Sequence, residues 1–290
     1  MAALSLDAAE HRRPAIRRRR TLAYAAATPI APIAALPVEL LRPGNGITLA
    51  VCVALVAVTH GLALFTAGGA VPLGVIAGVV LATLLAHLVN TLDEFGPADG
   101  AEVPTVLRDG DLYADVVLPL RRLARSIAVC FGPGAIALWL AGGLSGSAWA
   151  AVAAGLFAVG LAAWPAVLLT MVEASTPLNL LPHRLLGLAR ACGRDYPAVV
   201  ALVAVALATS AVAGVLLVEV GYVVYGRSLL RPASPPPLVP TGSLAYACVA
   251  SAIYLAHLAA AAIGRLHRLH GDRFPWLLQR HERRATPAAP

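Results

Sequence analysis

Residues 47–92, ITLAVCVALVAVTHGLALFTAGGAVPLGVIAGVVLATLLAHLVNTL, carry no charged side chain. An α-helix rises about 1.5 Å per residue, so about 20 apolar residues cross the hydrocarbon core of a bilayer. The stretch is too long for one crossing, and GGAVP at 68–72 supplies a turn near its middle. It therefore predicts two consecutive transmembrane helices, at 47–67 and 71–90.

The composition of the whole chain indicates the same environment. Of its 290 residues, 59% are hydrophobic and 13% are charged, whereas soluble domains carry about 25% charged residues. A soluble protein of this length cannot bury so much apolar surface. We expect an all-α, polytopic helical membrane protein with six transmembrane helices in three hairpins. The predicted helices cover 47–67, 71–90, 126–144, 147–172, 198–220 and 243–264.

The positions of the arginines predict the orientation. All 22 basic residues are Arg, and only Arg227 and Arg231 fall in the connections on one side of the predicted bundle. Basic residues gather on the cytoplasmic side of membrane proteins, so both termini are expected there. Arginine without lysine, together with abundant Ala, Gly and Pro, is typical of a GC-rich bacterial genome, which favours the bacterial inner membrane. The net charge of +7 is then explained by arginines that lie beside anionic lipid headgroups and fix the topology. No nucleic-acid partner is therefore expected.

The chain divides into a basic cytoplasmic N-terminus at 1–46, a transmembrane domain at 47–264 and a basic cytoplasmic tail at 265–290. Within the N-terminus, the apolar segment 21–41 contains Pro29, Pro32 and Pro37, each of which removes a backbone donor and breaks a helix. We expect broken helices lying at the membrane interface. A cleaved signal is the alternative, because a twin-arginine pair precedes the segment.

Six polar or helix-breaking residues are predicted to lie at a similar depth, near the cytoplasmic ends of the helices: Thr83, His87, Pro133, Pro165, Thr170 and His257. Pro133, in a Gly-Pro-Gly sequence, and Pro165 each lie about 10 Å from the inner face. Broken helices at matched depth often expose backbone groups to a binding site, so these residues predict a polar layer in the inner half of the bundle. Two alternatives stay open for His87 and His257: hydrogen bonding to neighbouring carbonyls as part of helix packing, and paired axial ligation of a haem.

No catalytic residue, metal site or cofactor is predicted. The four cysteines are scattered and form no C-x-x-C pair, so neither a disulfide framework nor a zinc site is supported. They are Cys52, Cys130, Cys192 and Cys248. None of the common hydrolase, kinase or nucleotide-binding patterns is present, which favours a non-enzymatic protein.

Four further positions carry expectations that follow from their depth or spacing. Glu219 falls at the predicted outer interface, so a solvated boundary position is expected. His60 has no evident partner and is interpreted as a packing residue. Gly74 and Gly78 form a G-x-x-x-G pattern, which favours close helix packing or a dimer.

The loop 93–125 contains seven acidic residues. Its sequence DGDLYAD begins like a calcium-binding loop, but Ala114 stands where glycine is required and Leu120 where glutamate is required. We expect a solvated loop that serves as a docking surface for a cytoplasmic protein partner. The second cytoplasmic loop predicts a short helix at 182–192.

Two stretches carry a resemblance to known proteins. TLDEFGPADGAEVPTVLRDGDLYADVVLPL at 91–120 and GRLHRLHGDRFPWLLQRHERR at 264–284 resemble uncharacterised bacterial multi-spanning membrane proteins of unknown function. That resemblance implies three hairpins and no particular activity. In layout, with the segment 21–41 before the first helix and the loop 93–125 after the second, the chain is also similar to the six-span permeases of ABC exporters.

Three functions follow as hypotheses. The first is a scaffold, assembly or accessory factor whose cytoplasmic loops recruit partners, with membrane lipid around its helices. The second is a permease or transport subunit that uses the inner-half polar layer. The third is a haem- or quinone-binding electron-transfer subunit.

Overall fold

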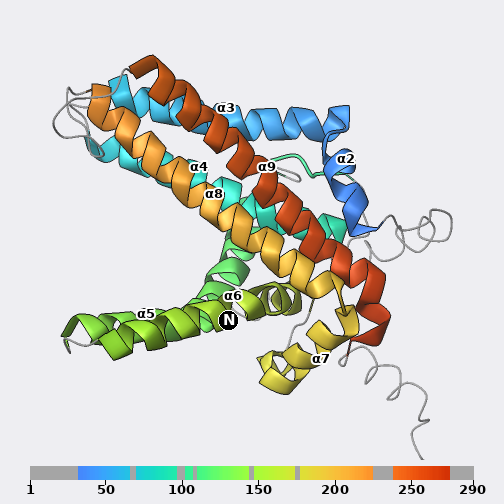
Figure 1. The fold of residues 1–290 in the computed structure, drawn as a ribbon. Helices are drawn as coiled ribbons and strands as arrows, with labels where there is room; N and C mark the ends of the chain where they lie inside the picture. The colour runs from blue at the N-terminus through green and yellow to red at the C-terminus, as the bar shows by residue number, and fades with distance from the viewer. Residues whose placement is uncertain are drawn as a thin grey trace, which may run out of the picture.

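A computed structural model describes residues 32–65, 70–96, 102–106, 110–143, 147–173, 177–224 and 238–274. All regular structure in these ranges is helical (Figure 1). Six of the helices there are long and apolar enough to cross a membrane, which confirms the all-α, polytopic fold. They are α3 (Pro43–Phe65), α4 (Ala70–Phe95), α5 (Leu118–Gly143), α6 (Ser147–Glu173), α8 (Asp195–Val224) and α9 (Leu238–His270). The three-hairpin arrangement and the cytoplasmic termini stay predictions.

Several helices continue beyond the membrane spans predicted from hydropathy. A π-helical segment, η2 (Tyr113–Val117), leads directly into α5, and α9 ends at His270. Loss of apolar character marks where the hydrocarbon ends, whereas a helix ends only where its backbone hydrogen bonds stop. The predicted short helix is confirmed as α7 (Pro182–Cys192), which ends at Gly193 with a φ of 56°.

The two prolines predicted to interrupt helices do not do so. Helix α5 continues through Pro133 and α6 through Pro165, so the prediction of a break is wrong at both. A proline removes one backbone donor and can bend a helix without ending it, and α5 and α6 also pack closely against each other near these positions. Gly160 of α6 lies directly against the backbone of Cys130 on α5, where a Cβ atom would clash.

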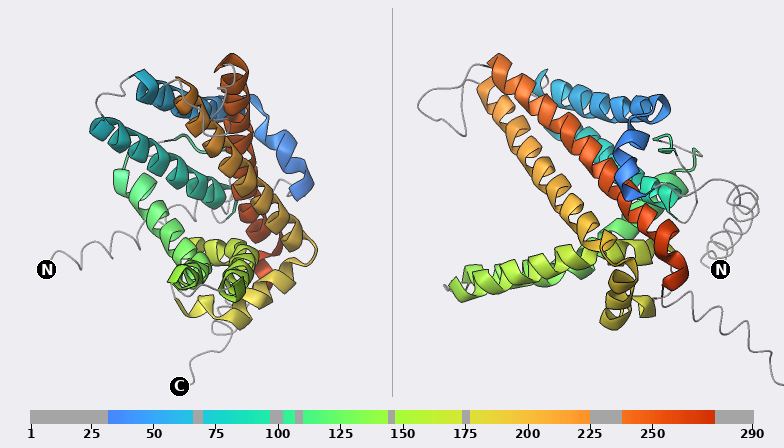
Figure 2. Two further views of the ribbon diagram at one scale, coloured as in Figure 1. Left: turned by 60° about the vertical axis from the view of Figure 1, so that its left-hand side comes forward. Right: turned by 45° about the vertical axis from the view of Figure 1, so that its right-hand side comes forward.

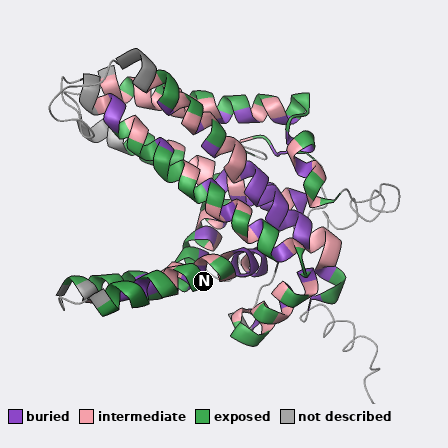
Figure 3. Ribbon diagram, viewed as in Figure 1, coloured by how far each residue is buried: buried purple, intermediate pink, exposed green. Residues whose placement is uncertain are grey.

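The helices form two arms that meet at one end of the molecule. Helices α3, α4, α8 and α9 make one arm, and the α5–α6 pair diverges from it (Figures 1 and 2). Buried residues concentrate where the arms meet (Figure 3). Members of this main core are Leu92, Phe95, Leu169, Val199 and Leu266, all at helix ends predicted to be cytoplasmic. A small second cluster, Ala213, Val249 and Ala252, lies farther along α8 and α9.

The short helix α2 (Leu36–Leu40) packs against the end of α9. Leu36 and Leu40 are fully buried, and Glu39 accepts a charge-assisted hydrogen bond of 2.6 Å from Arg265. The pair is buried, with 11% and 3% of the two side chains exposed. Residues 32–41 are thus fixed to the protein itself, and residues 21–31 of the predicted interfacial segment lie outside the described residues.

The described parts of the loop 93–125 are also fixed to the bundle. Asn45 accepts a hydrogen bond from the backbone of Val103 and donates one to the carbonyl of Glu39, both at 2.8 Å. Asn90 donates a 2.9 Å hydrogen bond to the carbonyl of Asp115, whose side chain is buried. The expectation of a solvated loop is therefore wrong for Val103, Pro104 and Asp115, which are buried, whereas Glu102 and Thr105 are exposed.

Two other expectations change in the structure. Glu219 is 1% exposed, so the prediction of a solvated boundary residue is wrong: depth along a helix does not determine which face a side chain occupies. A Cβ atom added to Gly78 would meet no atom within 4 Å. The described glycine of the G-x-x-x-G pattern therefore makes no close helix contact within this chain.

Candidate metal centre

His87 of α4 and His257 of α9 lie side by side in the interior of the protein. Their ring centroids are 5.1 Å apart at an interplanar angle of 54°, and 0% and 2% of the two residues are exposed. The two helices cross at Gly96 and Gly264, where a Cβ on Gly96 would lie 2.9 Å from the Cα of Gly264. Each histidine precedes its glycine by two to three helical turns of about 5.4 Å, so the crossing sets the two rings at one level.

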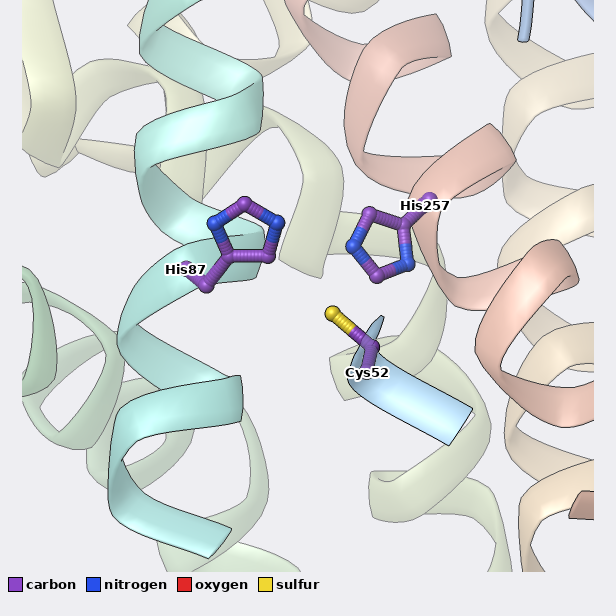
Figure 4. A group of neighbouring side chains, drawn as sticks. All are labelled: Cys52, His87 and His257. Atoms are coloured by element: carbon purple, nitrogen blue, oxygen red, sulfur yellow. The ribbon is translucent and has the colours of Figure 1, made fainter. Parts of the chain in front are cut away.

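A third donor, Cys52, comes from α3. Its residue is fully buried, and its Sγ atom and one nitrogen from each imidazole lie within 4.8 Å of one another. Figure 4 shows the two rings beside each other, with the sulfur next to both of them. One thiol and two imidazoles from three different helices thus converge on one point.

The hydrogen bonds of His257 determine which of its nitrogens is available. Its Nδ1 lies 2.7 Å from the carbonyl oxygen of Ile253. A carbonyl oxygen only accepts, so Nδ1 carries the proton and Nε2 carries a lone pair. Among the described residues, Nε2 of His257 and both ring nitrogens of His87 have no hydrogen-bond partner.

His60 provides the comparison. Its Nδ1 is 2.9 Å from the hydroxyl of Tyr246 on α9, and its Nε2 is 3.1 Å from the carbonyl of Leu217 on α8. His60 therefore joins three helices, in keeping with its interpretation as a packing residue, but it has partners that the sequence did not reveal. Both ring nitrogens of His60 thus have hydrogen-bond partners on neighbouring helices, whereas no nitrogen of His87 and only one of His257 has a partner among the described residues.

The unsatisfied nitrogens have a measurable cost. A buried polar group without a partner costs about 1–3 kcal/mol, so three of them together cost roughly 3–9 kcal/mol. That total compares with about 5–15 kcal/mol for the net stability of a typical protein. A bound group that engages these nitrogens removes the penalty, which makes the cluster a candidate binding site.

The cluster fits a single ion better than a haem. A haem held by His87 and His257 would have its iron between the two rings and its porphyrin spread around the iron, but the Sγ atom of Cys52 lies within 4.8 Å of a nitrogen of each ring, inside the area that the porphyrin needs. Thiolate and imidazole are the ligands that copper and zinc prefer in proteins. The donor set therefore indicates a transition-metal ion.

The structure brings together only part of the predicted polar layer. Thr83 donates its hydroxyl proton to the carbonyl of Val79 on its own helix, at 2.9 Å. Thr170 does the same with Ala166, at 2.7 Å. This local bonding is common for threonine in helices, so neither hydroxyl proton is left for a ligand. Pro133 is exposed on α5, and Pro165 is buried in the body of α6.

The sequence prediction missed Cys52 and assigned no metal ligands. It treated the four cysteines as one scattered set, because metal motifs are usually recognised by close spacing along the chain. Depth was the signal that could have found this residue. Cys52 lies five residues after the predicted inner end of the first helix at residue 47, in the same layer as the two histidines.

Comparisons with protein-family models, with curated proteins and with solved structures found no match to this chain. The resemblance to uncharacterised bacterial membrane proteins and to exporter permeases therefore stays a prediction from the sequence.

Proposed function

We propose that this multi-pass membrane protein is a non-enzymatic transport subunit of the bacterial inner membrane, which binds an ion between α3, α4 and α9. The observation that carries the proposal is the buried pair His87 and His257, three of whose four ring nitrogens have no partner among the described residues. Polar residues within membrane segments are costly and commonly belong to ion pathways. His60, which joins three helices, has both ring nitrogens bonded, and the pair His87 and His257 differs from it in this respect.

The distribution of the core supports movement of an ion to the site. The main core lies at the helix ends predicted to be cytoplasmic, and the described outer halves of α8 and α9 contribute the small cluster of Ala213, Val249 and Ala252. Regions with few buried apolar contacts open at lower free energy than a dense core. The proposed route of the ion therefore leads to the site through these outer halves.

Thiol labelling in membrane vesicles tests whether water reaches the site. Cysteines 130, 192 and 248 are replaced by serine so that Cys52 remains, and the matched control retains only Cys130, which is buried between α5 and α6. A charged, membrane-impermeant thiol reagent is then applied to each face of the membrane. We expect modification of Cys52 from at least one face and none of Cys130. If Cys52 reacts only after denaturation in detergent, the transport proposal is wrong.

An accessory role is the second candidate function. It is favoured by the hydrogen bonds through which Asn45 and Asn90 anchor Val103 and Asp115 to the bundle, because an anchored loop presents a defined surface to a cytoplasmic protein. Chemical cross-linking from single cysteines at Glu102 and Thr105 in native membranes tests this role. A discrete cross-linked partner, lost when Asn45→Ala releases Val103, supports it, and cross-linking to lipid alone counts against it.

A further inference from the structure

We infer that the ion is monovalent copper, bound by Sγ of Cys52, Nε2 of His257 and one ring nitrogen of His87. The inference rests on the proposed function in using the same site, and it adds the identity of the ion. Its starting point is the convergence of one sulfur and two nitrogen donors within 4.8 Å of one another, on three residues that are at most 2% exposed.

The number of ligands separates copper from zinc. Structural zinc sites are almost always tetrahedral with four protein ligands, and catalytic ones complete three protein ligands with water. Here three donors converge in the described part of the chain, in a place with almost no exposure to solvent. Soft thiolate ligands suit both monovalent copper and zinc, so the number of ligands is what separates the two ions: one sulfur and two nitrogens complete a trigonal set for monovalent copper and leave zinc one ligand short.

The charge of the complex points the same way. Monovalent copper with one thiolate and two neutral imidazoles gives a site of zero net charge, whereas zinc leaves one positive charge. An unpaired charge in an apolar interior is strongly unfavourable. In the described part of the chain the donor cluster contains no carboxylate that could balance a positive ion. The buried acidic residues there are Glu39, Asp115 and Glu219, and Glu39 is paired with Arg265 at 2.6 Å. The neutral copper complex is therefore the one this environment stabilises.

His257 is already in the form a metal requires. Metal-bound histidines generally donate their other ring N–H to a carbonyl or carboxylate, which fixes the tautomer and the ring orientation. The 2.7 Å hydrogen bond from Nδ1 to Ile253 is an interaction of that kind. It directs the lone pair of Nε2 toward the space shared with His87 and Cys52 (Figure 4).

Binding involves no change of oxidation state. One copper–sulfur and two copper–nitrogen bonds form, the S–H bond of Cys52 breaks, and its proton passes to solvent. The copper ion enters and leaves as the monovalent ion. One proton is therefore released for each copper bound, and binding becomes tighter as pH rises because the thiol must lose its proton.

The test is an anaerobic titration of the full-length protein, purified in mild detergent, with monovalent copper in competition with a chromogenic copper chelator. We expect one tightly bound copper per chain. Cys52→Ser and His87→Gln should each weaken binding at least about 100-fold, since even loss of an outer-shell partner costs 10–100-fold. The matched controls are Cys130→Ser, which removes another buried cysteine, and His60→Gln, which alters another histidine in the bundle. Both controls should retain wild-type affinity.

Equal affinity of Cys52→Ser and Cys130→Ser would overturn the assignment, and so would stoichiometric zinc binding by a protein that does not take up copper. Should Cys52→Ser and His87→Gln fail to fold, the wild-type protein still decides the matter. It must develop the ultraviolet thiolate-to-copper absorption band at one equivalent, and a titration without that band contradicts the site. If the protein binds copper but Cys52 is not labelled, the transport proposal is refuted and the copper site stands. If Cys52 is labelled but no copper binds, the copper site is refuted and the transport proposal stands.

Discussion

Replacing Gly264 by alanine should loosen the crossing of α4 and α9 that sets the two histidines side by side. A Cβ at this position would lie 2.9 Å from the backbone nitrogen of Gly96 and 3.0 Å from the carbonyl carbon of Phe95, and closer still to the carbonyl oxygen of Leu92. Contacts under 3.0 Å do not occur for real Cβ atoms, and these neighbours are backbone atoms that no side-chain rotation can move. The two helices must therefore shift apart.

The expected loss of stability follows from two opposing effects. Forcing an extra methyl group into a packed core costs about 1–3 kcal/mol, and a backbone clash belongs at the upper end of that range. Alanine is favoured over glycine in a helix by about 1 kcal/mol. We expect Gly264→Ala to lower the free energy of unfolding by about 2 kcal/mol, which corresponds to a decrease of roughly 4–8 °C in Tm.

The buried cysteines provide the assay. Cys52, Cys130 and Cys192 are free and buried, so a fluorogenic maleimide reports unfolding as the protein is heated in detergent. The matched control is Gly78→Ala on α4, where a Cβ would meet no atom within 4 Å; it should leave Tm unchanged or raise it slightly. The reasoning is refuted if Gly264→Ala unfolds at the temperature of Gly78→Ala or higher. The shift of α9 should also weaken copper binding, which the control should not do.

Three further predictions concern other contacts. Glu39→Gln should lower the free energy of unfolding by about 3–5 kcal/mol, because it leaves the buried Arg265 charge without its 2.6 Å partner. In the double variant with Arg265→Gln, the loss measured by denaturant titration should be smaller than the sum of the two single losses. Additive losses would contradict a coupled pair. His60→Ala should cost about 1 kcal/mol through its bonds to Tyr246 and Leu217 while leaving copper affinity unchanged, and loss of copper would place His60 in the site. Reporter fusions at the two ends of the chain should both report the cytoplasm, as the arginine distribution predicts, and termini on opposite faces would refute the six-span topology.

The spans could be predicted from sequence because apolar length is a local property. The absence of charge between residues 47 and 92 required two crossings whatever the rest of the chain did. The proximity of His87 and His257 was also accessible, since residues at one depth in a bundle can meet. The contact between Gly96 and Gly264 was not, because it joins segments far apart in the chain and is seen only once α4 and α9 are placed together.

The failed predictions all concern how the helices are rotated and packed against one another, which the position of a residue along its own helix does not show. Depth along a helix was calculated from the rise per residue, but rotation about the helix axis was not, so Glu219 was assigned to solvent and is buried. Pro133 and Pro165 were expected to break helices that continue through them. Cys52 was overlooked because its partners come from α4 and α9, and no spacing along one helix shows that.

X-ray absorption at the copper K-edge on the full-length protein loaded with one equivalent of monovalent copper tests the central claim most directly. A three-coordinate copper should have one sulfur and two imidazole nitrogens in its first shell, and the sulfur contribution should disappear in Cys52→Ser. A first shell with two or more sulfurs, with no sulfur, or with a sulfur that persists in Cys52→Ser would show that copper does not bind between α3, α4 and α9 as described.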